Sequence, residues 1–190
     1  LSANDFIIPQ LDDEDLLPDP IQCDDGSLID VMVLYTPAAK NSAGGAAAIQ
    51  NVINIATTQV NEAYANSNVA QRINMVYVGE INYEEANTSF AQHLIRLKNK
   101  SDGFMDEAHA LRNQYKADVV QLMVEDFEYC GMAYLLSSLN PAFEAYAFSV
   151  VNWWCSTGSY TTAHELGHNM GSQHDIENAP QPPVFPYSYG

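Results

Sequence analysis

The stretch "TTAHELGHNMGSQHD", residues 161–175, restricts the fold of this chain more than any other feature. It holds three of the chain's five histidines, His164, His168 and His174. Residues four apart on a helix lie on one face, one turn apart, so His164 and His168 can present their imidazoles to a single point. Glu165 is turned by about 100° around the helix from His164. Its carboxylate can therefore reach a water held at that point without becoming a metal ligand.

The third histidine requires the chain to turn back after the helix. Gly171 can adopt the left-handed conformation that ends a helix at low cost, and the step from Gly171 to His174 then brings a third imidazole toward the other two. Three imidazoles and one water are a common ligand set for catalytic zinc. We therefore predict Zn²⁺ as the cofactor, held by the three histidines, with Glu165 as the general base that assists attack by zinc-bound water.

The same stretch also permits a second interpretation of Glu165. Thr162 and Glu165 match the capping-box pattern, in which the glutamate folds back onto the start of its own helix. Such a contact would remove the carboxylate from catalysis. The metal site requires the helix to begin earlier, within residues 156–162.

Charge and hydrophobicity limit the partners of the chain. The 190 residues carry a formal net charge of −17 with only 7 Lys and Arg, which is too few for a phosphate-binding surface. No apolar run approaches the ~20 residues that a membrane-spanning helix needs. We therefore expect neither a nucleic-acid partner nor membrane insertion.

The first part of the chain differs from the rest. Residues 1–22 contain six acidic residues and three prolines but no Lys or Arg. This composition favours an extended acidic N-terminal arm over residues 1–26, either a solvated tail or the remnant of a pro-segment. We expect the packed domain to cover residues 27–190.

The packed domain shows strand patterns alternating with helix patterns, which indicates an α/β fold with a mainly parallel sheet. The expected strands are residues 28–37, 73–83, 117–126, 131–136 and 144–152, and the expected helices are residues 46–67, 90–98 and 102–115.

The histidine stretch resembles the zinc signature of the metzincin metallopeptidases. The aspartate directly after the third histidine, Asp175, resembles the pattern found in the adamalysin and reprolysin branch of this family. Further similar stretches are "IDVMVLYTPAA", "NEAYANS", "DGFMDEAHALRNQY", "CGMAYL", "AFSVV" and "YSYG". Together they resemble bacterial secreted reprolysin-like peptidases, including the peptidyl-Asp metallopeptidase group.

The resemblance implies a metzincin-type zincin fold, with a twisted mixed sheet, one antiparallel edge strand, long helices and a zinc helix. It also implies a secreted, extracellular zinc endopeptidase made as a zymogen and acting on protein or peptide substrates. Substrate would pair with the edge strand. The residues of this strand would be Gly131, Met132, Ala133 and Tyr134. Gly171 and Asp175 would have structural roles beside the third ligand. No methionine follows His174, so we expect the lower subdomain with its Met-turn to be truncated.

The three cysteines have different expected roles. Cys130 and Cys155 flank the expected edge strand and the strand after it, which favours a disulfide between them over free thiols. Cys23 could pair with a cysteine in a C-terminal fragment, or its thiolate could ligate zinc and keep a zymogen shut.

Three functions remain open from the sequence. The leading one is a zinc metalloendopeptidase; the others are a zinc-bearing binding or adhesion module without catalysis, and a latent form closed by its own pro-segment. Retention of Glu165 favours catalysis, since binding zinc does not require that residue. His93 and His109 fall on other expected helices, and we interpret both as ordinary histidines.

Overall fold

A computed structural model of the chain describes residues 5–10 and 28–189. Its centre is a six-stranded sheet in the order β1-β5-β6-β4-β2-β3. The strands are β1 (Phe6–Ile7), β2 (Leu28–Tyr35), β3 (Arg72–Glu80), β4 (Val119–Val124), β5 (Gly131–Tyr134) and β6 (Phe148–Asn152). β4 pairs in parallel with β2 and β6, β2 pairs in parallel with β3, and β5 runs antiparallel to β6. The expected mixed α/β sheet is confirmed.

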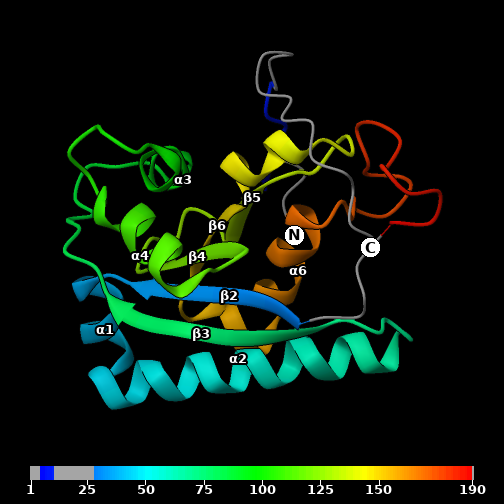
Figure 1. Ribbon diagram of the computed structural model, residues 1–190. Coiled ribbons are helices and arrows are strands. Elements are labelled where there is room, and N and C mark those ends of the chain that lie inside the picture. Colours follow the sequence, from blue (N-terminus) through cyan, green and yellow to red (C-terminus); the bar gives the residue numbers. More distant parts are fainter. Residues whose placement is uncertain (1–4, 11–27, 190) are drawn as a thin grey trace.

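The helices cover both faces of this sheet. They are α1 (Pro37–Ala43), α2 (Ala46–Asn66), α3 (Phe90–Lys98), α4 (Glu107–Tyr115), α5 (Cys155–Gly158) and α6 (Thr161–Asn169), with a 3-10 helix over Pro141–Tyr146. α2 runs below β2 and β3, whereas α3 and α4 lie on the opposite side of the sheet (Figure 1).

The long helix α2 is held by one apolar face. Ile49, Ile53 and Val60 recur at helical spacing and are buried in the core. α2 packs against β3 and also against α6. The zinc-motif helix α6 therefore packs between α2 and the sheet strands β5 and β6.

Two strand predictions need correction. β5 was expected at the edge of the sheet, but β1 pairs with it in parallel and forms the outermost strand. The last strand was expected over residues 144–152, but it begins at Phe148. Pro141 starts a 3-10 helix capped by the side chain of Asn140, and this helix takes up the first residues of that segment.

The expected disulfide between Cys130 and Cys155 is present. It ties the start of β5 to α5, just before the zinc-motif helix. Cys23 lies outside the described residues. Among the described helices, none is long and apolar enough to span a membrane.

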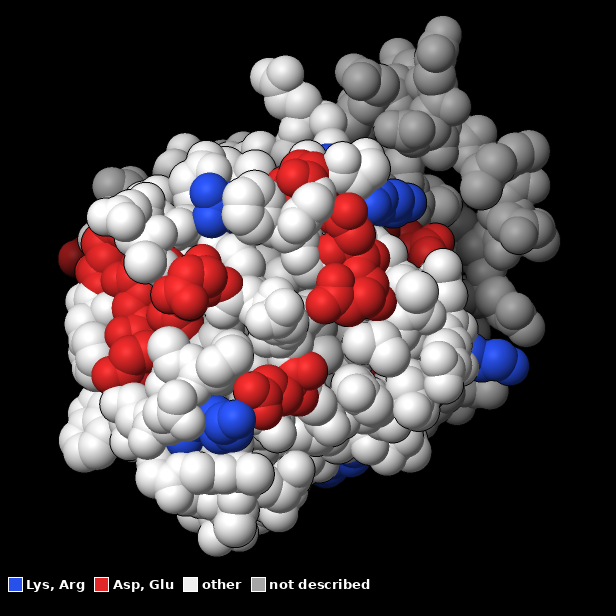
Figure 2. Space-filling view, turned by 90° about the vertical axis from the view of Figure 1, so that its left-hand side faces the viewer, with Lys and Arg blue, Asp and Glu red and all other residues white. Residues whose placement is uncertain are grey.

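Acidic side chains dominate the charge of the visible surface. On the face shown in Figure 2, Asp and Glu gather in several groups, with few Lys or Arg between them. This distribution agrees with the net charge of −17 and opposes the binding of polyanions.

Candidate metal centre

Helix α6 carries the first part of the histidine stretch. It begins at Thr161, after Tyr160 in the left-handed conformation (φ 55°). The Glu165 side chain makes no capping contact with the helix start, and the backbone N–H of His164 donates to the carbonyl of Tyr160. The capping-box interpretation is therefore wrong for this chain, and the carboxylate of Glu165 is not occupied by a contact with the helix start.

Two buried anchors hold α6 against the sheet. The side-chain amide of Asn169 donates to the carbonyls of Tyr134 on β5 and Phe148 on β6, at 2.8 and 3.2 Å. The backbone N–H of Leu136 donates to the carbonyl of His168 at 3.0 Å. Asn169 was not identified from the sequence, because a single asparagine beside a histidine carries no pattern that predicts a partner on another element.

The turn after α6 brings the third histidine to the other two. Gly171 has a φ of 92°, and a Cβ added there would lie 2.4 Å from Val184 Cγ1. Both the backbone and the neighbouring side chain therefore require glycine. The Nε2 atoms of His164 and His168 are 3.0 Å apart, and the His174 ring lies 5.3 and 5.0 Å from their ring centroids.

The protonation of these rings suits metal binding. Nδ1 of His168 lies 2.8 Å from the carbonyl of Ser172, so the proton sits on Nδ1 and leaves Nε2 free. Burial lowers the pKa of His174 against the attraction of Asp5. The neutral imidazole, which is the form that binds metals, is therefore favoured.

Glu165 is fully buried next to the cluster. Neither of its carboxylate oxygens has a hydrogen-bond partner in the part of the chain that the structure describes. A Cβ added to Gly131 would lie 2.2 Å from Glu165 Oε1, so the absence of a side chain on β5 makes room for this carboxylate. Burial raises its pKa well above the usual value, and the negative charge of Asp5 adds to this rise.

A residue from the N-terminal part of the chain completes the cluster. The carboxylate of Asp5 places Oδ1 at 2.6 Å from His174 Nε2 and 3.6 Å from His168 Nε2, and Oδ2 at 3.3 Å from His164 Nε2. Burial opposes ionisation of Asp5, but the contacts with His164 and His168 outweigh it and lower the pKa of the carboxyl group. Asp5 was not predicted as a site residue.

The four side chains fit one tetrahedral ion. Their nearest ligand atoms all lie within 4.8 Å of one another. Four ligands at about 2.1 Å from a tetrahedral zinc ion would be separated by about 3.4 Å. Three pairs lie 3.0 to 3.6 Å apart, and Asp5 and His174 are closer, at 2.6 Å. Both Asp5 oxygens and His174 Nε2 are buried, and the carboxylate contacts all three imidazoles. Three imidazole nitrogens and a carboxylate oxygen that converge in this way are suited to sharing one cation.

A wide groove lies beside the cluster. It has a volume of about 1200 Å³ and is lined by His164 and His168 together with apolar side chains such as Tyr64, Leu136 and Phe185. No Lys or Arg lines it among residues 5–10 and 28–189. A mostly apolar groove next to a metal cluster is suited to the side chain of a bound peptide.

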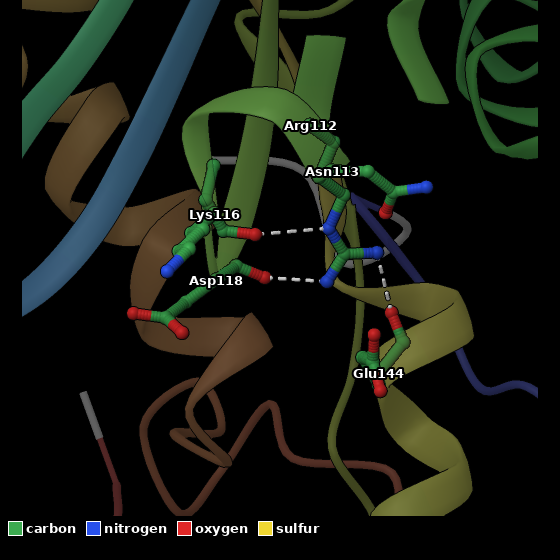
Figure 3. A pocket seen from close by; sticks show the side chains of 6 residues that line it. Arg112, Asn113, Lys116, Asp118 and Glu144 are labelled. Carbon is green, nitrogen blue, oxygen red and sulfur yellow. Dashed lines mark hydrogen bonds between the residues drawn. The ribbon is translucent and has the colours of Figure 1, made fainter. Parts of the chain in front are cut away.

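A second hollow, of about 320 Å³, has a different character. The guanidinium of Arg112 lies within it and donates to the carbonyls of Ala117, Asp118 and Glu144 at 3.1, 2.7 and 2.8 Å (Figure 3). Each of its three nitrogens already has a partner. Arg112 therefore ties backbone segments together and does not form an anion site.

The remaining predicted residues are placed as follows. Asp175 is exposed, and its carboxylate accepts hydrogen bonds from Asn178 and from the backbone N–H of Glu177. It closes a local turn after His174. His93 and His109 lie away from the cluster, on α3 and α4.

Three converging imidazoles with a buried carboxylate beside them are an arrangement typical of metal-dependent hydrolases. The chain belongs to metallo-peptidase family M12, whose family profile matches residues 26–188. The resemblance to reprolysin-like metallopeptidases is thereby confirmed.

Several curated relatives share the similarity. A peptidyl-Asp metalloendopeptidase of Stenotrophomonas maltophilia is 38% identical over 162 residues, covering 85% of this chain and 37% of the relative. A protein of the same name from Xanthomonas campestris is 35% identical over 162 residues, covering 85% of this chain and 37% of the relative. Another from Pseudomonas aeruginosa is 31% identical over 181 residues, covering 84% of this chain and 28% of the relative. The chain thus spans 37% or less of the length of these relatives.

Solved structures show the same fold at lower identity. A chain in the "Structure of a chaperone-substrate complex" has a TM-score of 0.63 at 20% identity, over 78% of this chain and 24% of that chain. Metalloproteinase-II from Bacteroides fragilis has a TM-score of 0.50 at 15% identity, over 82% of this chain and 45% of that chain. These similarities concern the fold alone.

Proposed function

We propose that this chain carries the active centre of a zinc-dependent endopeptidase that hydrolyses peptide bonds in proteins or peptides. The observation that carries the proposal is the convergence of three histidines with one partnerless buried carboxylate, Glu165. Membership of a metallopeptidase family and relatives named metalloendopeptidases support it.

Zinc is the ion that this donor set favours. Imidazole nitrogens with one carboxylate oxygen, at tetrahedral spacing, are typical zinc ligands. Calcium and magnesium prefer six or more oxygen ligands. The ligands on this chain would be the Nε2 atoms of His164, His168 and His174.

Each residue of the centre has a defined task in hydrolysis. Bound zinc supplies Lewis acidity for the substrate carbonyl and makes water easier to ionise. Glu165 accepts the proton of the attacking water and passes it to the leaving amine. Asn169 keeps α6 in register with β5, so the base and the substrate-binding strand stay at a fixed separation.

The substrate backbone would add to β5. The N–H groups of Ala133 on β5 and of Leu135 just after it, which donate to Asp5 and Ile7 in this structure, could donate to an extended peptide in place of β1. Gly131, Met132 and Tyr134 complete the same strand. The names of the relatives refer to cleavage at Asp, and an acidic side chain would need a basic partner. We do not assign this preference to the chain, because no basic side chain among the described residues lines the groove beside the cluster.

We also propose that the protein functions outside the cytoplasm. The disulfide between Cys130 and Cys155 supports an oxidising compartment. The acidic surface in Figure 2 favours solubility in water.

The test is the substitution Glu165→Gln, made in chains that also carry Asp5→Ala, which removes the carboxylate now touching the histidines. We expect cleavage of a casein-derived peptide to fall by roughly 10²–10⁴-fold, with zinc content unchanged because Glu165 is not a ligand. The matched control is Glu84→Gln, an exposed glutamate on the same background. Zinc binding without cleavage in any of these chains would identify a binding module instead.

A further inference from the structure

A buried glutamine, Gln173, lines the mostly apolar groove beside the metal cluster. We propose that Gln173 makes this groove selective for a tyrosine side chain of the substrate. The tyrosine ring would occupy the apolar part of the groove, and its hydroxyl would bond to the amide group of Gln173. The proposal rests on the function proposed above and names the substrate side chain that the centre prefers.

The amide group of Gln173 has unused hydrogen-bonding capacity. The residue is 2% exposed, and its Oε1 atom is buried with no hydrogen-bond partner in residues 5–10 and 28–189. A buried amide oxygen without a donor costs free energy, and this cost is recovered when a donor is supplied. A ligand in the groove that brings a donor to Oε1 therefore gains affinity over one that does not.

The backbone fixes Gln173 close to the metal ligands. Its N–H donates to the carbonyl of Ser188 at 2.7 Å, and the residue forms a parallel bridge with Tyr189. The next residue along the chain is the third histidine of the cluster, His174. Gln173 therefore lies where side chains adjoining the cleaved bond would enter the groove.

The other lining residues favour an uncharged aromatic ring. Leu136, Met170 and Phe185 supply apolar surface, and the groove has a volume of about 1200 Å³, which is roomy enough for a large side chain. The hydroxyl of Tyr64 donates to the sulfur of Met170 at 3.7 Å, so it is already occupied. None of the described residues that line the groove is Asp, Glu, Lys or Arg. A charged substrate side chain would find no ion-pair partner there, and its burial would be costly.

Tyrosine combines the two properties that this groove selects. Its ring offers a large apolar surface, and its hydroxyl is a single polar group at the far end. A hydroxyl both donates and accepts, so it pairs with the amide of Gln173 in either orientation of the amide. Phenylalanine would fill the same space but leave Oε1 without a partner, and an aspartate would bring a charge.

A second amide oxygen in the lining, Oδ1 of Asn169, is also buried without a partner among the described residues. Asn169 is a poor position for a test, because its amide nitrogen anchors α6 to the carbonyls of Tyr134 and Phe148. A change at Gln173, in contrast, removes no hydrogen bond of Oε1. Gln173 is therefore the position at which selectivity is separated from stability.

The experiment measures the binding of four peptides, Ac-Ala-Ala-X-Ala-Ala-NH2 with X as Tyr, Phe, Gln or Asp, by calorimetry. The zinc-loaded 190-residue chain carries Asp5→Ala, which removes the carboxylate that contacts the histidines, and Glu165→Gln, which prevents cleavage. We expect the Tyr peptide to bind roughly three- to tenfold more tightly than the Phe peptide, the effect of one neutral hydrogen bond. The Asp peptide should bind most weakly.

The variant Gln173→Met and the control Gln114→Met are made on the same background. Methionine is about as long as glutamine but has no amide, so the ratio of Tyr to Phe affinity should fall to about one in Gln173→Met. Gln114 is exposed on α4, and Gln114→Met should keep the ratio of the parent. Because the ratio compares two ligands on one protein, a smaller folded or zinc-loaded fraction does not change it.

Three results would overturn the selectivity: equal binding of the Tyr and Phe peptides by the parent, a Tyr preference that survives in Gln173→Met, or tightest binding of the Gln or Asp peptide. Absence of binding by all four peptides would overturn it as well. Peptidase activity is measured separately, in the Asp5→Ala chain that retains Glu165. Cleavage without a Tyr preference would leave the peptidase proposal standing. Tyr-selective binding without any cleavage would instead support the role of Gln173 and contradict peptidase activity.

Discussion

The metal cluster and the Arg112 side chain are both buried and polar, but they differ in how their polar atoms are satisfied. The guanidinium of Arg112 donates hydrogen bonds to three backbone carbonyls (Figure 3). In the cluster, neither carboxylate oxygen of the buried Glu165 has a hydrogen-bond partner among the described residues. Unsatisfied buried groups cost free energy, and a fold retains them where something else is bound. What distinguishes the functional site from the structural one is therefore whether its buried polar atoms have hydrogen-bond partners. Neither charge nor the shape of the cavity makes this distinction.

The largest expected effect concerns zinc and stability. Zinc at about 1,000 times its dissociation constant should stabilise the folded chain by about 4 kcal/mol, because the unfolded chain lacks the site. His164→Ala should abolish most of this gain, whereas His109→Ala, outside the cluster, should keep it. Denaturant unfolding with and without zinc measures the effect. An equal gain in both variants would contradict the assignment of the ligands.

Arg112→Met should destabilise the protein without affecting the metal. One buried and two partly buried carbonyls would lose their donor, and we expect the free energy of unfolding to fall by about 2 kcal/mol. The exposed Lys100→Met is the matched control. Zinc affinity of the folded protein should be unchanged in both. A loss of zinc affinity in Arg112→Met would show that the two sites are not independent.

Gly131→Ala tests how the substrate strand makes room for the base. The added Cβ would lie 2.2 Å from Glu165 Oε1, so the carboxylate must move. On the Asp5→Ala background we expect the cleavage rate to fall by roughly tenfold, the equivalent of about 1.4 kcal/mol, with zinc affinity retained. Gly158→Ala, where an added Cβ meets no atom within 4 Å, should cleave normally. Normal cleavage by Gly131→Ala would show that the position of Glu165 is not critical.

The smallest effect is a pH dependence from a third buried polar group. The hydroxyl of Tyr83 lies 2.8 Å from Nδ1 of His93, and Nε2 of His93 lies 3.2 Å from Asp126. Neutral His93 satisfies both contacts by accepting from Tyr83 and donating to Asp126. Burial accordingly lowers its pKa despite the attraction of Asp126.

The sign of this dependence follows from linkage. The unfolded chain binds the proton of His93 at a higher pH than the folded chain, so its stability contribution is complete above the ordinary pKa of about 6.5 and is lost as the pH falls through the lower folded value. Unfolding measured from pH 7 to 5 should show a smaller loss in His93→Gln than in the parent chain. An identical loss in both would rule out His93 as its source.

Much of the fold could be predicted because its signals are local. The apolar spacing of Ile49, Ile53 and Val60 predicts α2, and the continuous apolar run of β2 predicts a strand buried on both faces. The spacing of His164 and His168 similarly predicts a shared helix face. These patterns act within one element, so no knowledge of the tertiary structure is required.

The role of Asp5 could not be predicted, because it depends on pairing between distant segments. Proline and charge around it indicated an extended surface arm, and the pairing of β1 with β5 has no signature in a two-residue strand. A zinc-binding thiolate was instead considered for Cys23, which lies outside the described residues. Asn169 escaped prediction for the same reason, as did the space that Gly131, predicted only as a substrate-binding residue, leaves for Glu165, since the partners lie on other elements.

The most direct test of the account is a crystal structure of the zinc-loaded chain, with diffraction data collected on both sides of the zinc absorption edge. The account predicts a single anomalous peak at about 2.0–2.1 Å from Nε2 of His164, His168 and His174, with Glu165 outside the ligand set. A fully loaded crystal with no peak at this position, or with its zinc bound elsewhere, would contradict it.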